Sequence, residues 1–244
     1  MTVDSSSGAV PALKVLAADT STMTGSVALV EGAQVVAEWT LRSQRTHNRR
    51  LLAAIDRLLR EADWSLEDLD GLAVTAGPGS FTGVRIGLST MKGLAWAAGK
   101  RFLAVPTLDV LAAPLGLASL PICTLLDAKK QELYAAQYQP DGCGDCRREA
   151  DFQVLSPARL AAQITRPTLF CGDGWLLYRE VLRRLLGDRA IEAPAYFHTL
   201  RSGVLGILAC RRFAAGEKAD PSTAVPVYVR SSEAELKHPH LAQA

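Results

Sequence analysis

The sequence carries almost no net charge. Its 27 lysines and arginines stand against 25 aspartates and glutamates, which leaves a formal charge of +2 over 244 residues. A protein that binds nucleic acid on its own usually carries a basic patch or stripe, whereas here charges of both signs are interspersed along the chain. The composition therefore argues against a stand-alone nucleic-acid-binding protein.

Long apolar runs are also missing. No run approaches the roughly 20 residues that a helix needs to cross a bilayer. Residues 1–12 lack the basic start and the apolar centre of a signal peptide, so we expect a cytoplasmic protein without membrane association. With 48% hydrophobic and 21% charged residues, the chain can bury a core as one large domain or two small ones, and a disordered chain is excluded.

The five cysteines do not form a recognisable framework. They are Cys123, Cys143, Cys146, Cys171 and Cys210, and an odd number without a secretion signal argues against structural disulfides. Cys143 and Cys146 have the spacing of half a zinc site, but no second such pair follows, so a Gly/Asp-rich hairpin loop is the alternative. We expect no metal site. The G-x-S-x-G elbow, the H-E-x-x-H pair and the P-loop lysine are absent too, which leaves a hydrolase without its nucleophile or metal.

Hydrophobic periodicity predicts one order of strands and helices that occurs twice. The first copy has strands at 13–18, 25–30 and 35–41, a helix from about 51 to 62, a strand at 72–75 and a helix at about 82–98. After a linking strand at 102–105 and a helix, the second copy has strands at 122–126, 132–138 and 152–155, a helix at 158–164, a strand at 168–171 and a helix at 175–186, closed by a helix at about 200–214. This order indicates a duplicated α/β protein with a mixed sheet in each half.

The repeat also predicts the division of the chain. We expect a leader over residues 1–12, an N-terminal half over 13–106 that carries the interface helices, a C-terminal half over 107–224 and a tail over 225–244. The tail either packs back on the first half or reaches another subunit.

Duplicated halves of this kind place a cleft between them, and three turns supply candidate nucleotide ligands. The candidates are Asp19, Thr20 and Ser21 in the first hairpin, Asp127 at the matching strand end of the second half, and Gly172 and Gly174 before a helix. The carboxylates could hold Mg²⁺ through water, and the glycines could let a phosphate approach the backbone. Hairpin turns and helix starts use the same residue types for ordinary structural reasons, so both interpretations stay open.

Four segments resemble the successive signatures of the TsaB (YeaZ) family. They are Leu-Ala-Ala-Asp-Thr-Ser at 16–21, His-Asn-Arg-Arg-Leu-Leu at 47–52, Gly-Pro-Gly-Ser-Phe-Thr-Gly-Val-Arg-Ile-Gly at 77–87 and Leu-Asp-Ala-Lys-Lys-Gln-Glu-Leu-Tyr at 126–134. The glycine-rich segment is the most specific, and the hairpin around Asp127 is next. The segments occur in the order of the family and cover most of the chain from residue 13 onward.

The resemblance implies an actin-like, RNase H-like (ASKHA) fold in two βββαβα halves with mixed sheets. It also implies a non-catalytic subunit that supports its paralogue TsaD and works together with the ATPase TsaE. The complex transfers a threonylcarbamoyl group to the adenosine next to the tRNA anticodon. The donor of this group is an adenylate made by TsaC. A second copy of the chain is the expected partner when TsaD is absent. The chain is expected to bind tRNA only as part of the complex. The chain itself should require no cofactor, while ATP or ADP with Mg²⁺ remains open for the complex.

Two other functions compete with the partner subunit. A small-molecule kinase-like ATPase of the same fold would need a positioned carboxylate base and a substrate pocket. A metallopeptidase would need a second ligand beside His47. The catalytic paralogue carries two histidines four residues apart on its first helix, but here the residue four after His47 is Leu51, which cannot bind a metal.

The helix at 82–98 is apolar nearly all round, so it must be covered on more than one side. Val84, Leu88, Met91 and Ala95 form the expected core arc, and Arg85, Ser89 and Lys92 form a narrow polar strip. A second arc of mostly small residues, made by Gly83, Gly87, Thr90 and Leu94, fits either a partner helix or the first helix of the same half. The predicted interface set is His47, Asn48, Leu51, Leu52, Ile55, Phe81, Gly83, Arg85, Ile86, Gly87, Thr90 and Leu94.

Overall fold

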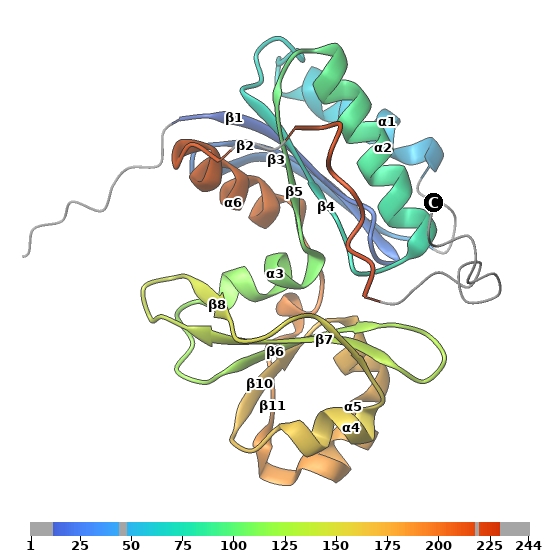
Figure 1. Cartoon of the computed structure of the whole chain (residues 1–244). Coiled ribbons are helices and arrows are strands. Elements are labelled where there is room, and N and C mark those ends of the chain that lie inside the picture. Colours follow the sequence, from blue (N-terminus) through green and yellow to red (C-terminus); the bar gives the residue numbers. More distant parts are fainter. Residues whose placement is uncertain (1–11, 44–47, 218–219, 230–244) are drawn as a thin grey trace, which may run out of the picture. The chain divides into compact units, whose positions relative to one another are not determined.

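The computed structural model describes residues 12–43, 48–217 and 220–229, without the side chains of residues 48 and 49. The expected leader therefore lies outside the described residues apart from Ala12. The chain divides into two compact units (Figure 1). The first holds residues 1–75, 85–105 and 201–224, and the second holds 76–84, 106–200 and 225–244.

The first unit is built on a mixed sheet of five strands in the order β3-β2-β1-β4-β5. The strands are β1 (Lys14–Asp19), β2 (Thr24–Glu31), β3 (Gln34–Arg42), β4 (Gly71–Thr75) and β5 (Arg101–Val105). The first three form the predicted antiparallel meander, while β4 pairs parallel with both β1 and β5. The central strands β1 and β4 are almost fully buried, because helices cover both faces of this sheet.

Helices α1 (Asn48–Glu61) and α2 (Phe81–Ala97) lie on one face of the first sheet, and α6 (Ser202–Ala214) lies on the other (Figure 1). The apolar stripe of α1 is buried at Leu51, Ile55 and Leu58, as its periodicity predicted. The core arc of α2 is confirmed as well, since Val84, Leu88, Met91 and Ala95 are all buried.

The position of α6 differs from the expectation that it closes the C-terminal half. It packs on β1, β2 and β4 of the first sheet. Two glycines allow this close approach: a Cβ at Gly206 would overlap the Val30 side chain, and one at Gly203 would come within 2.8 Å of Val35. The C-terminal half therefore does not extend through residue 214.

The second unit contains a mixed sheet of six strands in the order β11-β10-β6-β7-β8, with β9 paired to β7. The strands are β6 (Ile122–Asp127), β7 (Leu133–Pro140), β8 (Cys146–Arg148), β9 (Gln153–Leu155), β10 (Thr168–Cys171) and β11 (Ala190–Glu192). The three-residue strands β8 and β11 were not predicted, whereas the equally short β9 lies within the strand expected at 152–155. The antiparallel pair β6–β7 and the parallel pair β6–β10 repeat the arrangement of β1, β2 and β4.

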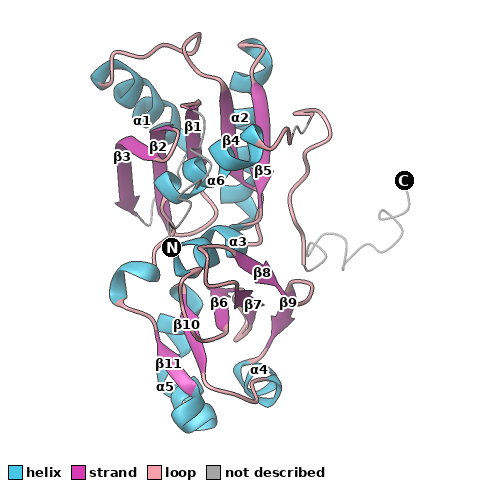
Figure 2. Cartoon of the chain, turned by 90° about the vertical axis from the view of Figure 1, so that its left-hand side faces the viewer, coloured by secondary structure: helices cyan, strands magenta, loops and turns pink. Residues whose placement is uncertain are grey.

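Helix α3 (Thr107–Ala112) covers one face of this sheet, and α4 (Pro157–Gln163) and α5 (Asp173–Leu186) cover the other (Figure 2). The short 3₁₀ turns are η1 (Ala113–Leu115), η2 (Gly187–Arg189) and η3 (Ala195–Phe197). In the core beneath α5, the rings of Phe170 and Trp175 stack at 4.8 Å between centroids. Within the described ranges, no helix combines the length and apolarity that crossing a membrane requires.

Candidate functional site

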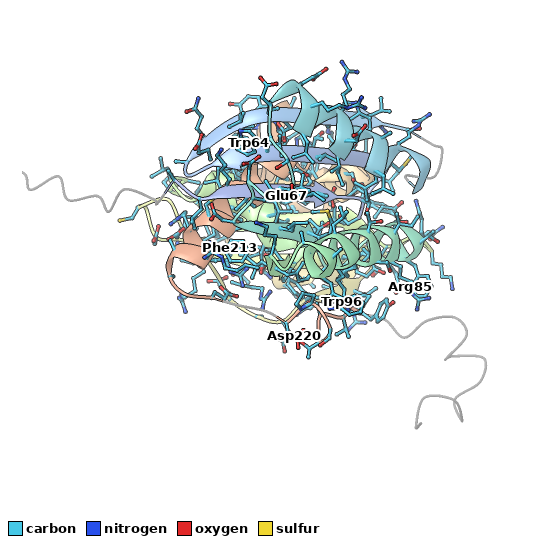
Figure 3. All side chains as sticks on the ribbon, turned by 90° about the horizontal axis from the view of Figure 1, so that it is seen from above. Trp64, Glu67, Arg85, Trp96, Phe213 and Asp220 are labelled. Carbon is cyan, nitrogen blue, oxygen red and sulfur yellow. The ribbon has the colours of Figure 1, made fainter. Side chains whose placement is uncertain are left out.

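Helix α2 is the centre of the candidate site, because it presents a large exposed side chain beside its buried arc. Arg85 and Ser89 point away from the core, and Trp96 on the same side is 84% exposed (Figure 3). A tryptophan buries a large area when it is covered, so Trp96 is a candidate contact residue. The sequence interpretation omitted Trp96, although it lies on the polar strip of the same helical wheel.

The loop before α2 is fixed by contacts within the chain. The Ser80 hydroxyl accepts a hydrogen bond from the Gly83 N–H at 3.2 Å, which caps the start of the helix. The Gly77 carbonyl accepts from the N–H of Thr107 at 2.8 Å and thereby ties the loop to the start of α3. The glycine-rich signature thus has a structural role in positioning α2.

A segment near the C-terminus crosses the beginning of α2. The N–H of Val227 donates to the Ala76 carbonyl at 2.7 Å, and the rings of Tyr228 and Phe81 lie 5.6 Å apart. Further along α2, Lys92 Nζ donates to the carbonyl of Ala224 at 2.9 Å. The described residues 220–229 therefore contact α2 of the same chain and the loop before it. Residues 230–244 lie outside the described part.

The predicted interface residues of α1 separate into two groups. Leu51 and Ile55 are buried in the core of the first unit, whereas Leu52 is 53% exposed. Of this predicted set, only Leu52 is shown to be available to a partner on α1. His47 lies outside the described residues, and so does the side chain of Asn48.

The small-residue arc of α2 does not form an open groove. Gly87 is buried, and a Cβ there would overlap the hydroxyl oxygen of Thr20. Gly83 is also buried, and Ile86, Thr90 and Leu94 are partly buried. The idea that Gly87 receives a partner helix is therefore wrong. Its lack of a side chain serves packing inside the chain.

The first nucleotide candidate is a closed turn. Asp19 Oδ1 accepts from the N–H of Ser21 at 2.9 Å, and from the hydroxyls of Ser21 and Thr75 at 2.5 Å each. Asp19, Thr20 and Ser21 are all buried. An oxygen that accepts three donors in a buried turn stabilises that turn.

The second candidate group holds its own backbone together. Asp127 Oδ1 accepts from the Lys129 N–H at 2.8 Å, and Asp127 Oδ2 pairs with Lys129 Nζ at 2.6 Å. The Asp173 carboxylate accepts from the Asp127 N–H at 3.2 Å, and burial raises the pKa of Asp173. This carboxylate stands at the beginning of α5, where a helix would otherwise attract a phosphate.

The two glycines beside Asp173 also face protein. A Cβ at Gly172, whose φ is +104°, would overlap the carbonyl oxygen of Leu125, and one at Gly174 would lie 2.8 Å from the carbonyl carbon of Leu126. The backbone of β6 therefore packs closely against both glycines. Both glycines thus have a packing role within their own unit.

Cys171 and Cys146 are poor nucleophiles. Burial raises the pKa of Cys171 to about 12 and that of Cys146 to about 11, so both thiols are protonated at neutral pH. The Cys146 thiol also donates to the Ala112 carbonyl at 3.3 Å. Among residues 12–43, 48–217 and 220–229, no three His, Cys, Asp or Glu side chains are grouped so that they could hold a metal.

Known proteins resemble this chain in sequence and in architecture. The model of the TsaD family, tRNA N6-adenosine threonylcarbamoyltransferase, matches residues 35–238. The chain is 31% identical over 227 residues to the tRNA threonylcarbamoyladenosine biosynthesis protein TsaB of Bacillus subtilis, covering 92% of this chain and 97% of that protein. It is 33% identical over 235 residues to the Escherichia coli protein of the same name, covering 93% and 99%. The chain belongs to the TsaB family.

Solved structures agree with membership of the TsaB family. YeaZ from Pseudomonas aeruginosa superposes with a TM-score of 0.77 at 32% identity, over 88% of this chain and 99% of that one. The predicted actin-like fold is confirmed. The similarity to a tRNA N6-adenosine threonylcarbamoyltransferase of Chlorobaculum tepidum, at 43% identity, spans 63 residues, or 18% of that protein. This TsaB-family chain thus matches TsaB proteins along their length and that enzyme over a segment.

Proposed function

We propose that this chain is the non-catalytic partner subunit of a TsaD-like enzyme that transfers a threonylcarbamoyl group to the adenosine next to the tRNA anticodon. The observation that carries the proposal is the full-length relationship to TsaB biosynthesis proteins. The side chains support a role without chemistry of its own: Asp19 is enclosed in a turn, and Leu51 is a buried core residue four positions after His47.

The TsaD-like partner would dock on the outward side of α1 and α2. Leu52 on α1 and Phe81 and Trp96 on α2 are large apolar side chains that remain exposed on helices covering one face of the first sheet. Aromatic side chains are enriched in protein interfaces, and covering these three removes apolar surface from water. Without this partner, a second copy of the chain would occupy the same surface.

The remaining components follow from the same role. A TsaE-like ATPase would join the pair, tRNA would be bound through the complex, and ATP or ADP with Mg²⁺ would belong to the complex, since the candidate nucleotide residues of this chain contact its own backbone. The chain itself would need no cofactor and would act in the cytoplasm.

Reconstitution tests the proposal. Purified chain, its TsaD counterpart, a TsaE counterpart, threonylcarbamoyl adenylate and unmodified tRNA should yield modified adenosine, and omission of this chain should abolish the product. The chain alone should neither hydrolyse ATP nor carry stoichiometric metal. ATP hydrolysis by the isolated chain that Asp19→Ala or Asp127→Ala removes, with no effect of the chain on tRNA modification, would favour the kinase-like alternative.

A further inference from the structure

Helix α5 carries a second exposed apolar surface. Its inner side is buried at Trp175, Leu182 and Leu186. On its outer side Leu177, Val181 and Leu185 are 58%, 44% and 42% exposed. Residues four apart lie one above another on a helix, so these three make a continuous aliphatic stripe, which we call the α5 stripe.

The α5 stripe lies on the side of α5 that the sheet and α4 leave uncovered. It continues across Tyr178, whose φ of −109° and ψ of 15° interrupt the regular helix. Leu176 beside it is exposed as well. Single exposed leucines are common, but a row of them along one helix indicates a surface that another element covers.

One flank of the α5 stripe carries a charge of each sign. Glu180 and Arg184 are both exposed and lie four residues apart. The other two arginines nearby, Arg179 and Arg183, pair with Glu192 at 2.6 and 2.7 Å. Within the part of the chain that the structure describes, Glu180 and Arg184 have no ion-pair partner.

We propose that the α5 stripe is the docking surface for the α5 helix of a second copy of this chain, packed antiparallel about a two-fold axis near Val181. In such a pair, each flank of one helix faces the same flank of the other helix. The two helices run in opposite directions, so the order of residues along the second flank is reversed. Glu180 of one copy then lies opposite Arg184 of the other, twice in each dimer. Leu177 lies opposite Leu185 in the same way, and Val181 packs near its own counterpart.

The charge pattern selects this occupant over others. The flank has no net charge, so an acidic or a basic partner gains no overall attraction from it. An unrelated helix would have to supply an aliphatic stripe together with the same two charges in reversed order, whereas a second copy supplies both. The surface uses neither α1 nor α2, and it is therefore independent of the docking that the proposed function requires.

The contact is small. Stable protein interfaces involve about 20–30 residues on each side, far more than one helical stripe supplies. We therefore expect self-association that depends on protein concentration, and surface ion pairs that weaken as salt is added.

Sedimentation equilibrium of the full chain over a range of concentrations tests the proposal. Glu180→Arg and Arg184→Glu should each turn two attractive pairs into two repulsive ones and weaken association roughly tenfold. The double variant Glu180→Arg/Arg184→Glu restores opposite charges and should return association to near the wild-type value. Asp188→Arg, an exposed charge reversal just beyond α5, is the matched control and should have no such effect.

Val181→Lys should abolish association at this surface without lowering the unfolding temperature, because Val181 is exposed. The proposal is overturned if the single charge variants and Val181→Lys leave the mass distribution unchanged, or if the double variant stays as weak as the singles. A dimer formed through α1 and α2 would persist equally in every variant, so failure here and failure of the proposed function are distinguishable. Vesicle binding that depends on Val181, in a chain that stays monomeric, would also overturn it.

Discussion

Thr20 occupies the space that any side chain at Gly87 would need. A Cβ at position 87 would overlap the Thr20 hydroxyl oxygen and come within 3.3 Å of a methyl group of Val74. Two of the signature segments therefore touch each other inside the first unit, where the turn after β1 meets the first half of α2. The glycine in the eleven-residue segment is explained by this contact, and it needs no partner.

We expect Gly87→Ala to destabilise the chain by about 1–3 kcal/mol, the usual cost of overpacking a tight core. Gly93→Ala on the same helix is the control, because a Cβ there meets nothing within 4 Å. That substitution should stabilise the chain by up to about 1 kcal/mol through helix propensity. Urea unfolding of both variants measures the two changes in the free energy of unfolding. Equal changes for Gly87→Ala and Gly93→Ala would contradict the packing argument.

Removal of the Asp19 carboxylate should destabilise the first unit. Asp19→Ala leaves the Ser21 N–H, the Ser21 hydroxyl and the Thr75 hydroxyl without the acceptor that they share. Each buried group left without a partner costs about 1–3 kcal/mol, so we expect a loss of at least about 2 kcal/mol in the free energy of unfolding. Thr75→Val removes one donor and should cost less. A full-stability Asp19→Ala variant that loses only nucleotide binding would show that Asp19 is a ligand.

Local patterns predicted much of the fold. The burial of Met91 and Leu88 followed from the 3.6-residue period of their helix, and the meander of β1 to β3 followed from short apolar strands separated by turn residues. These features depend on neighbours in the sequence, and the sequence displays neighbours directly.

Contacts between distant segments could not be predicted in the same way. The helix at Ser202–Ala214 follows the second sheet in the chain but packs on the first, because Gly206 fits against Val30, 176 positions earlier in the sequence. The pairing of Val227 with Ala76 is of the same kind. For the candidate site, the periodicity of α1 located Leu51 and Leu52 but gave no exposed fraction for either.

Two ion pairs of similar geometry should differ in their contribution to the free energy of unfolding, because only one of them has a buried carboxylate. Glu38 is 7% exposed, pairs with Arg201 at 2.9 Å and accepts from the Gly203 N–H at the start of α6 at 2.8 Å. Glu38→Ala should lower the free energy of unfolding by about 2 kcal/mol. Glu61 pairs with Arg57 at 2.8 Å on the open surface, so Glu61→Ala should change stability by less than about 0.5 kcal/mol. Chemical denaturation at low and high salt measures both.

The stability of the chain should fall in mild acid because of His198. Burial lowers the pKa of this imidazole, and the Glu192 carboxylate at 3.6 Å opposes the effect only in part. The unfolded chain binds a proton near pH 6.5 while the folded chain does not, so stability is level above about pH 7 and falls as the pH drops through 6.5 toward the folded pKa.

His198→Gln should remove this component, which is at most about 1.4 kcal/mol per pH unit. The measurement is the difference in unfolding free energy between wild type and variant from pH 7.5 to 5.5. The raised pKa of Asp173 acts in both proteins and cancels in that difference. Parallel curves for the two proteins would show that His198 does not contribute.

The interface prediction contrasts two adjacent leucines of α1. Leu52 is 53% exposed, so Leu52→Asp should leave the unfolding temperature of the isolated chain unchanged and should weaken binding to the TsaD counterpart by roughly tenfold to a hundredfold. Leu51 is 3% exposed, so Leu51→Asp places a carboxylate in the core and should unfold the chain. Trp96→Ala should behave like Leu52→Asp, because both side chains lie on the same proposed surface and neither supports the core. Calorimetric titration with the counterpart, beside thermal unfolding of the same samples, separates binding from folding. If Leu52→Asp and Trp96→Ala both bind as tightly as wild type, α1 and α2 are not the docking surface, and the partner must contact the chain elsewhere.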